Sequence, residues 1–75
     1  MKPRPDKPRV GFAGVGWIGR HRMEAILATG AVSAAAIADP SPAMLDEARA
    51  LAPEAAALTR FEDLLAMDLD GVVIA

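Results

Sequence analysis

The sequence predicts an α/β protein, a parallel sheet with helices on both faces. Three observations support this. Short apolar runs that suit strands alternate with segments whose apolar residues recur at helical spacing. The runs are apolar throughout, which is typical of strands buried on both faces. Gly, Pro and Asp separate the segments. Such alternation favours parallel strands joined by right-handed crossovers.

The first predicted strand and helix lie on either side of a glycine-rich turn. Residues 9–13, RVGFA, are short, apolar and bounded by glycine, as expected of a buried strand. A helix is predicted from Trp17, with Gly30 after Thr29 as its C-terminal stop. We expect one broad apolar face on this helix, made of Ile18, Met23, Ala25, Ile26 and Leu27.

A second strand and helix are predicted on either side of Asp39–Pro40. Residues 32–38, VSAAAIA, form the strand although alanine is a poor strand former, because the segment is bounded on both sides by chain breakers. Ser41 is the predicted N-cap of the next helix and Pro42 its first residue. Pro53 is expected to end that helix.

The remaining elements are shorter. Residues 55–58 are predicted to form a third strand. Thr59 and Glu62 have the spacing of a capping box, which predicts a helix that ends at Ala66. Residues 71–75, GVVIA, are rich in β-branched side chains and form the last predicted strand, which would lie at an exposed edge of the sheet.

Composition limits the classes of function. The chain has 75 residues, 53% of them hydrophobic, and a net charge of −2, so we expect one folded domain without a nucleic-acid partner. It has no Cys and one His, which argues against a metal site. No apolar run is long enough for a bilayer, so no membrane partner and a cytoplasmic location are expected. Residues 1–8, which contain three prolines, are predicted to be a flexible tail.

A glycine motif dominates the sequence between the first strand and the first helix. Residues 14–19, GVGWIG, match the pattern G-x-G-x-x-G. The pattern alone is weak, but here it follows a predicted strand and opens a predicted helix. An acid, Asp39, ends the next strand, and it lies 20 residues after Gly19 (39 − 19). This combination indicates a dinucleotide-binding loop.

Each residue of the loop has a physical role in that interpretation. Gly14 permits the sharp turn, Gly16 lets a pyrophosphate approach the backbone, and Gly19 allows close packing of helix on strand. The amides of Trp17 and Ile18 are expected to point at the phosphates, at the positive end of the helix.

The acid indicates which cofactor is bound. Asp39 would accept hydrogen bonds from the adenosine ribose and repel a 2′-phosphate, which favours NAD over NADP. The sequence leaves NADP open, because the Ser41 hydroxyl can donate to a phosphate. Two other readings also stay open: a turn without a ligand, and a different nucleotide-like ligand such as S-adenosylmethionine.

Three segments resemble a known family more closely than a generic Rossmann fold. RVGFAGVGWIGRH, AIADPSP and FEDLLAMDLDGVVIA are similar to the N-terminal part of the Gfo/Idh/MocA oxidoreductases. The resemblance implies a dinucleotide-binding domain, a partial βαβαβ Rossmann fold, over residues 9–75. It also implies NAD(P)-dependent oxidation of sugar, inositol or related hydroxyl groups. The cofactor contacts that it implies are Gly14, Gly16, Trp17, Ile18 and Asp39.

The catalytic part of that family has no counterpart here. Members carry later a Thr-Pro turn beside the nicotinamide, a Lys and an Asp/His pair, whereas this chain has no Lys after Lys7 and no His after His21. We therefore assign no catalytic residue and expect a chain truncated before the nicotinamide half and the substrate domain, inactive by itself. The alternatives are a non-catalytic nucleotide-binding module, or a split-protein fragment whose sheet is completed by the remainder of a parent chain, by another partner or by a second copy.

Overall fold

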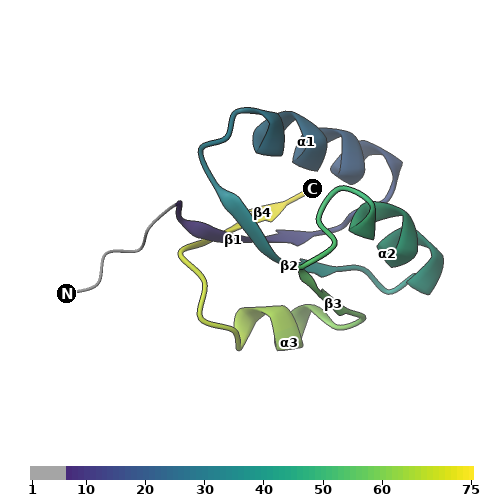
Figure 1. Cartoon of the computed structure of the whole chain (residues 1–75). Coiled ribbons are helices and arrows are strands. Elements are labelled where there is room, and N and C mark those ends of the chain that lie inside the picture. The colour runs from purple at the N-terminus through teal and green to yellow at the C-terminus, as the bar shows by residue number, and fades with distance from the viewer. Residues whose placement is uncertain (1–6) are drawn as a thin grey trace.

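Strands and helices alternate along the whole described chain. The computed structural model describes residues 7–75 (Figure 1). Its elements are β1 (Arg9–Ala13), α1 (Trp17–Ala28), β2 (Ser33–Ala38), α2 (Pro42–Arg49), β3 (Ala56–Leu58), α3 (Phe61–Leu65) and β4 (Gly71–Ile74). The strands are parallel and lie in the order β3-β2-β1-β4. The predicted α/β class and the predicted order of elements are confirmed.

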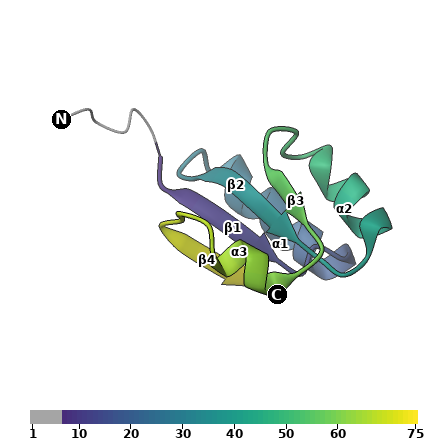
Figure 2. The ribbon, with the colours of Figure 1, turned by 90° about the horizontal axis from the view of Figure 1, so that it is seen from below.

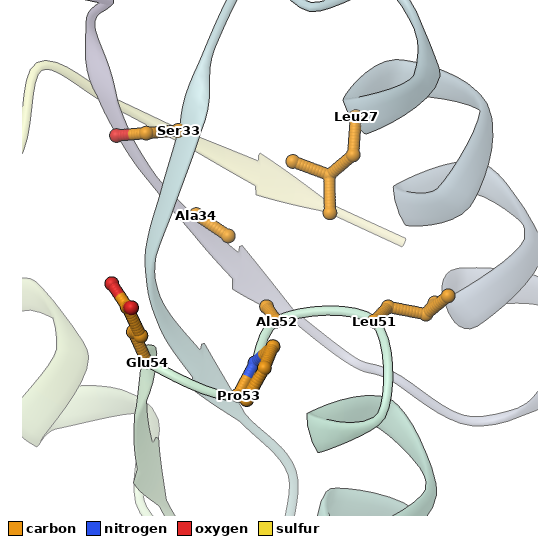
Figure 3. Close-up of a pocket in the computed structure, with 7 residues that line it drawn as sticks. All are labelled: Leu27, Ser33, Ala34, Leu51, Ala52, Pro53 and Glu54. Atoms are coloured by element: carbon orange, nitrogen blue, oxygen red, sulfur yellow. The ribbon is translucent and has the colours of Figure 1, made fainter.

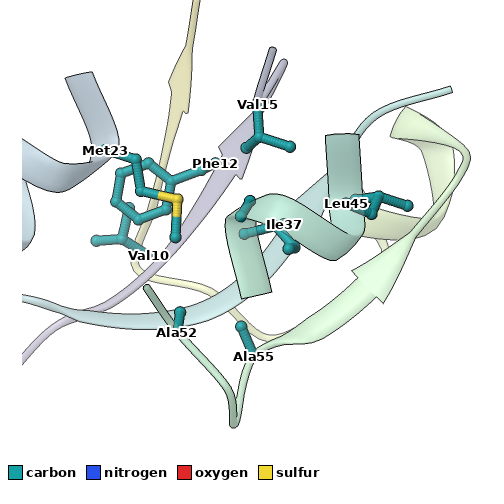
Figure 4. Close-up of a cluster of buried hydrophobic side chains, with 9 residues drawn as sticks. Val10, Phe12, Val15, Met23, Ile37, Leu45, Ala52 and Ala55 are labelled. Carbon is teal, nitrogen blue, oxygen red and sulfur yellow. The ribbon is translucent and has the colours of Figure 1, made fainter. Parts of the chain in front are cut away.

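Helices cover both faces of the sheet. α1 and α2 lie on one face and α3 lies on the other (Figures 1 and 2). The larger core lies under α1 and α2, where Val10 and Phe12 of β1 meet Met23, Ile37 and Leu45 (Figure 4). Alternate residues of a strand point to opposite faces of the sheet. Gly11, which lies between Val10 and Phe12 on β1, therefore faces α3.

Small side chains let α3 approach the sheet closely. Leu64 of α3 is fully buried against Ala36 and Ala38 of β2. A Cβ added at Gly11 would lie 2.8 Å from Leu69 Cδ1 and 3.1 Å from Leu64 Cδ1. Ala36 and Ala38, which make β2 a weak strand by propensity, are thus small residues at the positions where α3 packs.

A change of register between β1 and β2 alters which residues of β2 face the larger core. Val10 pairs with Ala34 and Gly11 with Ala36, so Ala35 is the extra residue of a bulge. As a result Ala34 and Ile37, three positions apart, both pack on the core under α1 and α2. Strict alternation along β2 would have placed them on opposite faces.

Several element ends differ from the prediction. Helix α2 ends at Arg49, before Pro53, and the chain continues in tight turns in which Leu51 N–H and Ala52 N–H bond to the Ala48 and Arg49 carbonyls. The capping box at Thr59 is wrong, because Arg60 is the N-cap of α3 and no side chain caps that helix.

The predicted cap of α2 forms, whereas the apolar face of α1 differs from the prediction. The Ser41 cap is confirmed, since its Oγ accepts from Met44 N–H (3.4 Å). Ile18 and Ala25 are exposed, so the apolar face of α1 is narrower than predicted.

Of the predicted tail, residues 1–6 lie outside the described residues, and Pro8 O accepts from Ser33 N–H (2.9 Å). In residues 7–75 no helix has the length and apolar character to span a bilayer.

Gly30 is expected to resist substitution because of its backbone conformation. It follows the cap residue Thr29 with φ +73, in the left-handed region, and a Cβ there would meet no other atom. Gly30→Ala should therefore cost about 1 kcal/mol of unfolding free energy through conformation alone. Gly30→Asn should cost less, because Asn tolerates this conformation better. Urea denaturation of both variants checks this, and equal losses would contradict it.

Candidate functional site: the glycine loop between β1 and α1

The glycine loop lies at the C-terminal ends of the parallel strands. β1 ends at Ala13, and Gly14 turns the chain towards α1 with φ +85, a conformation that favours glycine. Gly14 N–H donates to the Ala38 carbonyl at the end of β2 (2.8 Å). The turn is thus anchored to the neighbouring strand.

Gly19 serves packing inside the protein. It is buried in the first turn of α1. A Cβ at Gly19 would overlap the Gly14 carbonyl oxygen and lie 2.8 Å from the Gly14 carbonyl carbon. This is the close approach of helix to turn that the sequence predicts for the last glycine of the motif.

Within residues 7–75, neither packing nor backbone conformation requires a glycine at position 16. Its φ of −67 is open to any residue, and an added Cβ would have no neighbour within 4 Å. The missing side chain leaves open space directly above the backbone at the start of α1. Glycine is a good N-cap residue, but packing does not exclude a side chain here, so the open space is free for a ligand that approaches the loop.

Backbone donors lie at the start of α1, next to Gly16. The N–H of Arg20 donates to Gly16 O (2.7 Å). The three preceding amides, of Trp17, Ile18 and Gly19, have no acceptor within the helix, as in every helix N-terminus. Together with the helix dipole they make the start of α1 favourable for an anion.

Asp39 is brought to the loop by the order of the strands. Its N–H donates to Leu58 O of β3 (3.0 Å). Its carboxylate Oδ2 accepts from Val15 N–H (3.0 Å) and its Oδ1 from Ser41 N–H (2.9 Å). Each carboxylate oxygen has a second lone pair, so the half-buried group can still accept hydrogen bonds from a ligand.

Apolar side chains flank the loop. A hollow of about 490 Å³ is lined by Gly14, Gly16, Trp17, Ile18, Gly19 and Ala75. Trp17 is 68% and Ile18 is 64% exposed. The Trp17 ring meets His21 edge to face, with centroids 4.7 Å apart. The structure thus brings Asp39 and the predicted loop residues together, with Ser41 joined to them through Asp39.

Sequence reasoning missed three features around the loop. These are the Val15 amide as the partner of Asp39, Ala75 in the wall of the hollow, and an ion pair between Arg20 and Glu47 (2.8 Å) that joins α1 to α2. None has a signal in the sequence, because each depends on how distant segments pack.

A second hollow lies at the other end of the strands, where they begin. It has a volume of about 300 Å³ and is lined by Leu27, Ser33, Ala34, Leu51, Ala52, Pro53 and Glu54 (Figure 3). These residues lie near the starts of β2 and β3, whereas the glycine loop follows the end of β1. No predicted site residue lines it.

Strand order and turn together define the class of fold. The order β3-β2-β1-β4, with a glycine turn after β1, is that of the first half of a Rossmann-type domain. The structure is similar to that of the WlbA dehydrogenase from Bordetella pertussis in complex with NADH and UDP-GlcNAcA, with a TM-score of 0.81 and 29% sequence identity. The match covers 99% of this chain and spans 22% of that chain. No protein-family model and no curated protein matches the sequence.

Proposed function

We propose that this chain is the NAD-binding portion of an NAD-dependent oxidoreductase. Gly16 is the observation that carries the proposal: a glycine that packing does not require, in open space, beside helix amides that have no acceptor within the helix. The likeness to a dehydrogenase that was solved with NADH supports the same cofactor.

The loop would hold the adenosine half of NAD. The pyrophosphate would lie over Gly16 and accept hydrogen bonds from the amides of Trp17 and Ile18. The remaining lone pairs of Asp39 would accept from the adenosine ribose hydroxyls. The negative charge of Asp39 would disfavour the 2′-phosphate of NADP, while the Ser41 hydroxyl nearby moderates that preference.

Bound NAD would supply the hydride acceptor, and the residues of this chain would bind and orient it. Oxidation of an alcohol also needs a base near the substrate hydroxyl. We assign that base to no residue here, since the imidazole of His21 packs against Trp17 on the side of α1. Activity on sugar, inositol or related hydroxyl groups, as in the Gfo/Idh/MocA oxidoreductases, is our proposal for the whole protein. The remainder of such a protein, or a second copy, would cover the edge at β4, where Ile74 is 66% exposed.

A titration with three ligands tests the cofactor assignment. We expect NAD and ADP-ribose to bind within about threefold of each other, because the loop contacts only the half that they share. NADP should bind at least about tenfold more weakly through repulsion by Asp39. Fluorescence of Trp17, which lines the loop hollow, reports binding, and calorimetry gives an independent value. Absence of binding by all three at millimolar concentration would contradict the proposal.

A further inference from the structure

We propose that Asp39 is a positioning residue that holds the glycine loop in its binding shape before a ligand arrives. This role is additional to the contact with ribose, and its ligand-dependent part rests on the proposed function. The carboxylate accepts one amide from the loop, that of Val15, and one from the turn that begins α2, that of Ser41. It therefore joins two segments that flank the binding surface.

The loop is fixed at few points. Gly14 N–H is bonded to Ala38 O, and Val15 N–H is bonded to Asp39 Oδ2. Val15 lies between Gly14 and Gly16, and glycines lose the most conformational freedom on folding. A carboxylate is a stronger hydrogen-bond acceptor than a neutral carbonyl group. The bond to Asp39 thus restrains the loop between two glycines.

Asp39 follows a strand that is hydrogen-bonded on both sides. β2 is paired on both sides, with β1 and with β3, and Asp39 N–H donates to Leu58 O at the end of β3. On the other side of the bond, the Val15 side chain is fully buried in the core. The carboxylate is therefore held by the sheet, and the amide is held by the core. The hydrogen bond between them fixes the loop relative to the sheet.

Such a restraint would raise the affinity for phosphate groups without touching them. A loop that is already ordered loses less entropy when a ligand binds. If Asp39 acted only on ribose hydroxyls, its removal would matter only for ligands that have those hydroxyls. If it positions the loop, its removal weakens every ligand held by the loop amides.

Hydrogen exchange in the ligand-free chain tests the restraint directly. In Asp39→Ala we expect the Val15 amide to exchange at least about tenfold faster, after correction for global stability, because its acceptor is gone. The Gly14 amide, bonded to Ala38 O, should change less than about threefold. Asp46→Ala, which removes an exposed carboxylate from α2, should leave both amides unchanged. An unchanged Val15 amide in Asp39→Ala would overturn the proposal.

A pair of nucleotides separates positioning from ribose contact. ADP has both ribose hydroxyls, and 2′,3′-dideoxy-ADP has neither. We expect Asp39→Ala to weaken 2′,3′-dideoxy-ADP about fivefold by NMR titration, equivalent to loss of one modest hydrogen bond. Removal of the charge alone would tighten binding of a diphosphate, so weakening cannot come from electrostatics. Asp39→Asn removes the same charge but keeps one acceptor, and should lie between wild type and Asp39→Ala.

The two proposals fail in different ways. If wild type and Asp39→Ala bind 2′,3′-dideoxy-ADP equally, Asp39 does not position the loop, although NAD can still bind. If wild type binds neither nucleotide nor NAD, the proposed function is wrong, and the exchange of the Val15 amide still decides whether Asp39 restrains the loop.

Discussion

Gly19→Ala is expected to destabilise the domain by about 3 kcal/mol, because the new methyl group has no place in the native structure. It would overlap the Gly14 carbonyl oxygen and lie 3.1 Å from the Ala75 side chain. The Gly14 carbonyl group belongs to the backbone of the turn, which the hydrogen bond from Gly14 N–H to Ala38 O holds in place. Moving it aside would therefore cost free energy. For a chain of 75 residues the total stability is about 4–11 kcal/mol, so this loss is a large share of it.

Chemical denaturation followed by circular dichroism measures this loss. Gly71→Ala is the matched control, since Gly71 lies at the start of β4 and an added Cβ there meets no atom within 4 Å. The control should stay within about 0.5 kcal/mol of wild type. A stable Gly19→Ala protein, within 1 kcal/mol of wild type, would mean that α1 does not lie as close to the turn as the structure has it.

Gly16→Val should abolish NAD binding, with an affinity at least about 100-fold lower, while the domain stays folded. The branched side chain would fill the open space above the start of α1, where we place the pyrophosphate. Its effect on folding should be small, about 1 kcal/mol, because a Cβ here meets no protein atom and Val is only a poorer N-cap than Gly.

Calorimetric titration with NAD checks the affinity, and thermal denaturation checks the fold. Gly71→Val adds the same side chain in open space at the first residue of β4, away from the loop, and should leave NAD affinity unchanged. Undiminished binding by Gly16→Val would show that no phosphate lies over this glycine. Loss of binding by both variants would point to a general effect instead.

The sequence was sufficient for the order of the elements and for the loop. Apolar runs between chain breakers indicated the strands, and the motif at residues 14–19 with Asp39 indicated the turn and its acid. These signals are local or have a fixed spacing, so one chain displays them without an alignment. The reason for each of the three glycines was also predicted, and the structure agrees that Gly14 needs its φ and that Gly19 needs its missing side chain.

Tertiary packing decided what local signals could not. Ala36 and Ala38 lie in a strand against their propensity, and Leu64 of α3 packs on them. Thr59 has the spacing of a cap, but β3 extends to Leu58 and the helix begins only after Arg60. The sequence by itself determined which residues form the loop and that an acid follows β2. Only the fold decided that Asp39 bonds to Val15, because that contact requires β1 and β2 to end side by side.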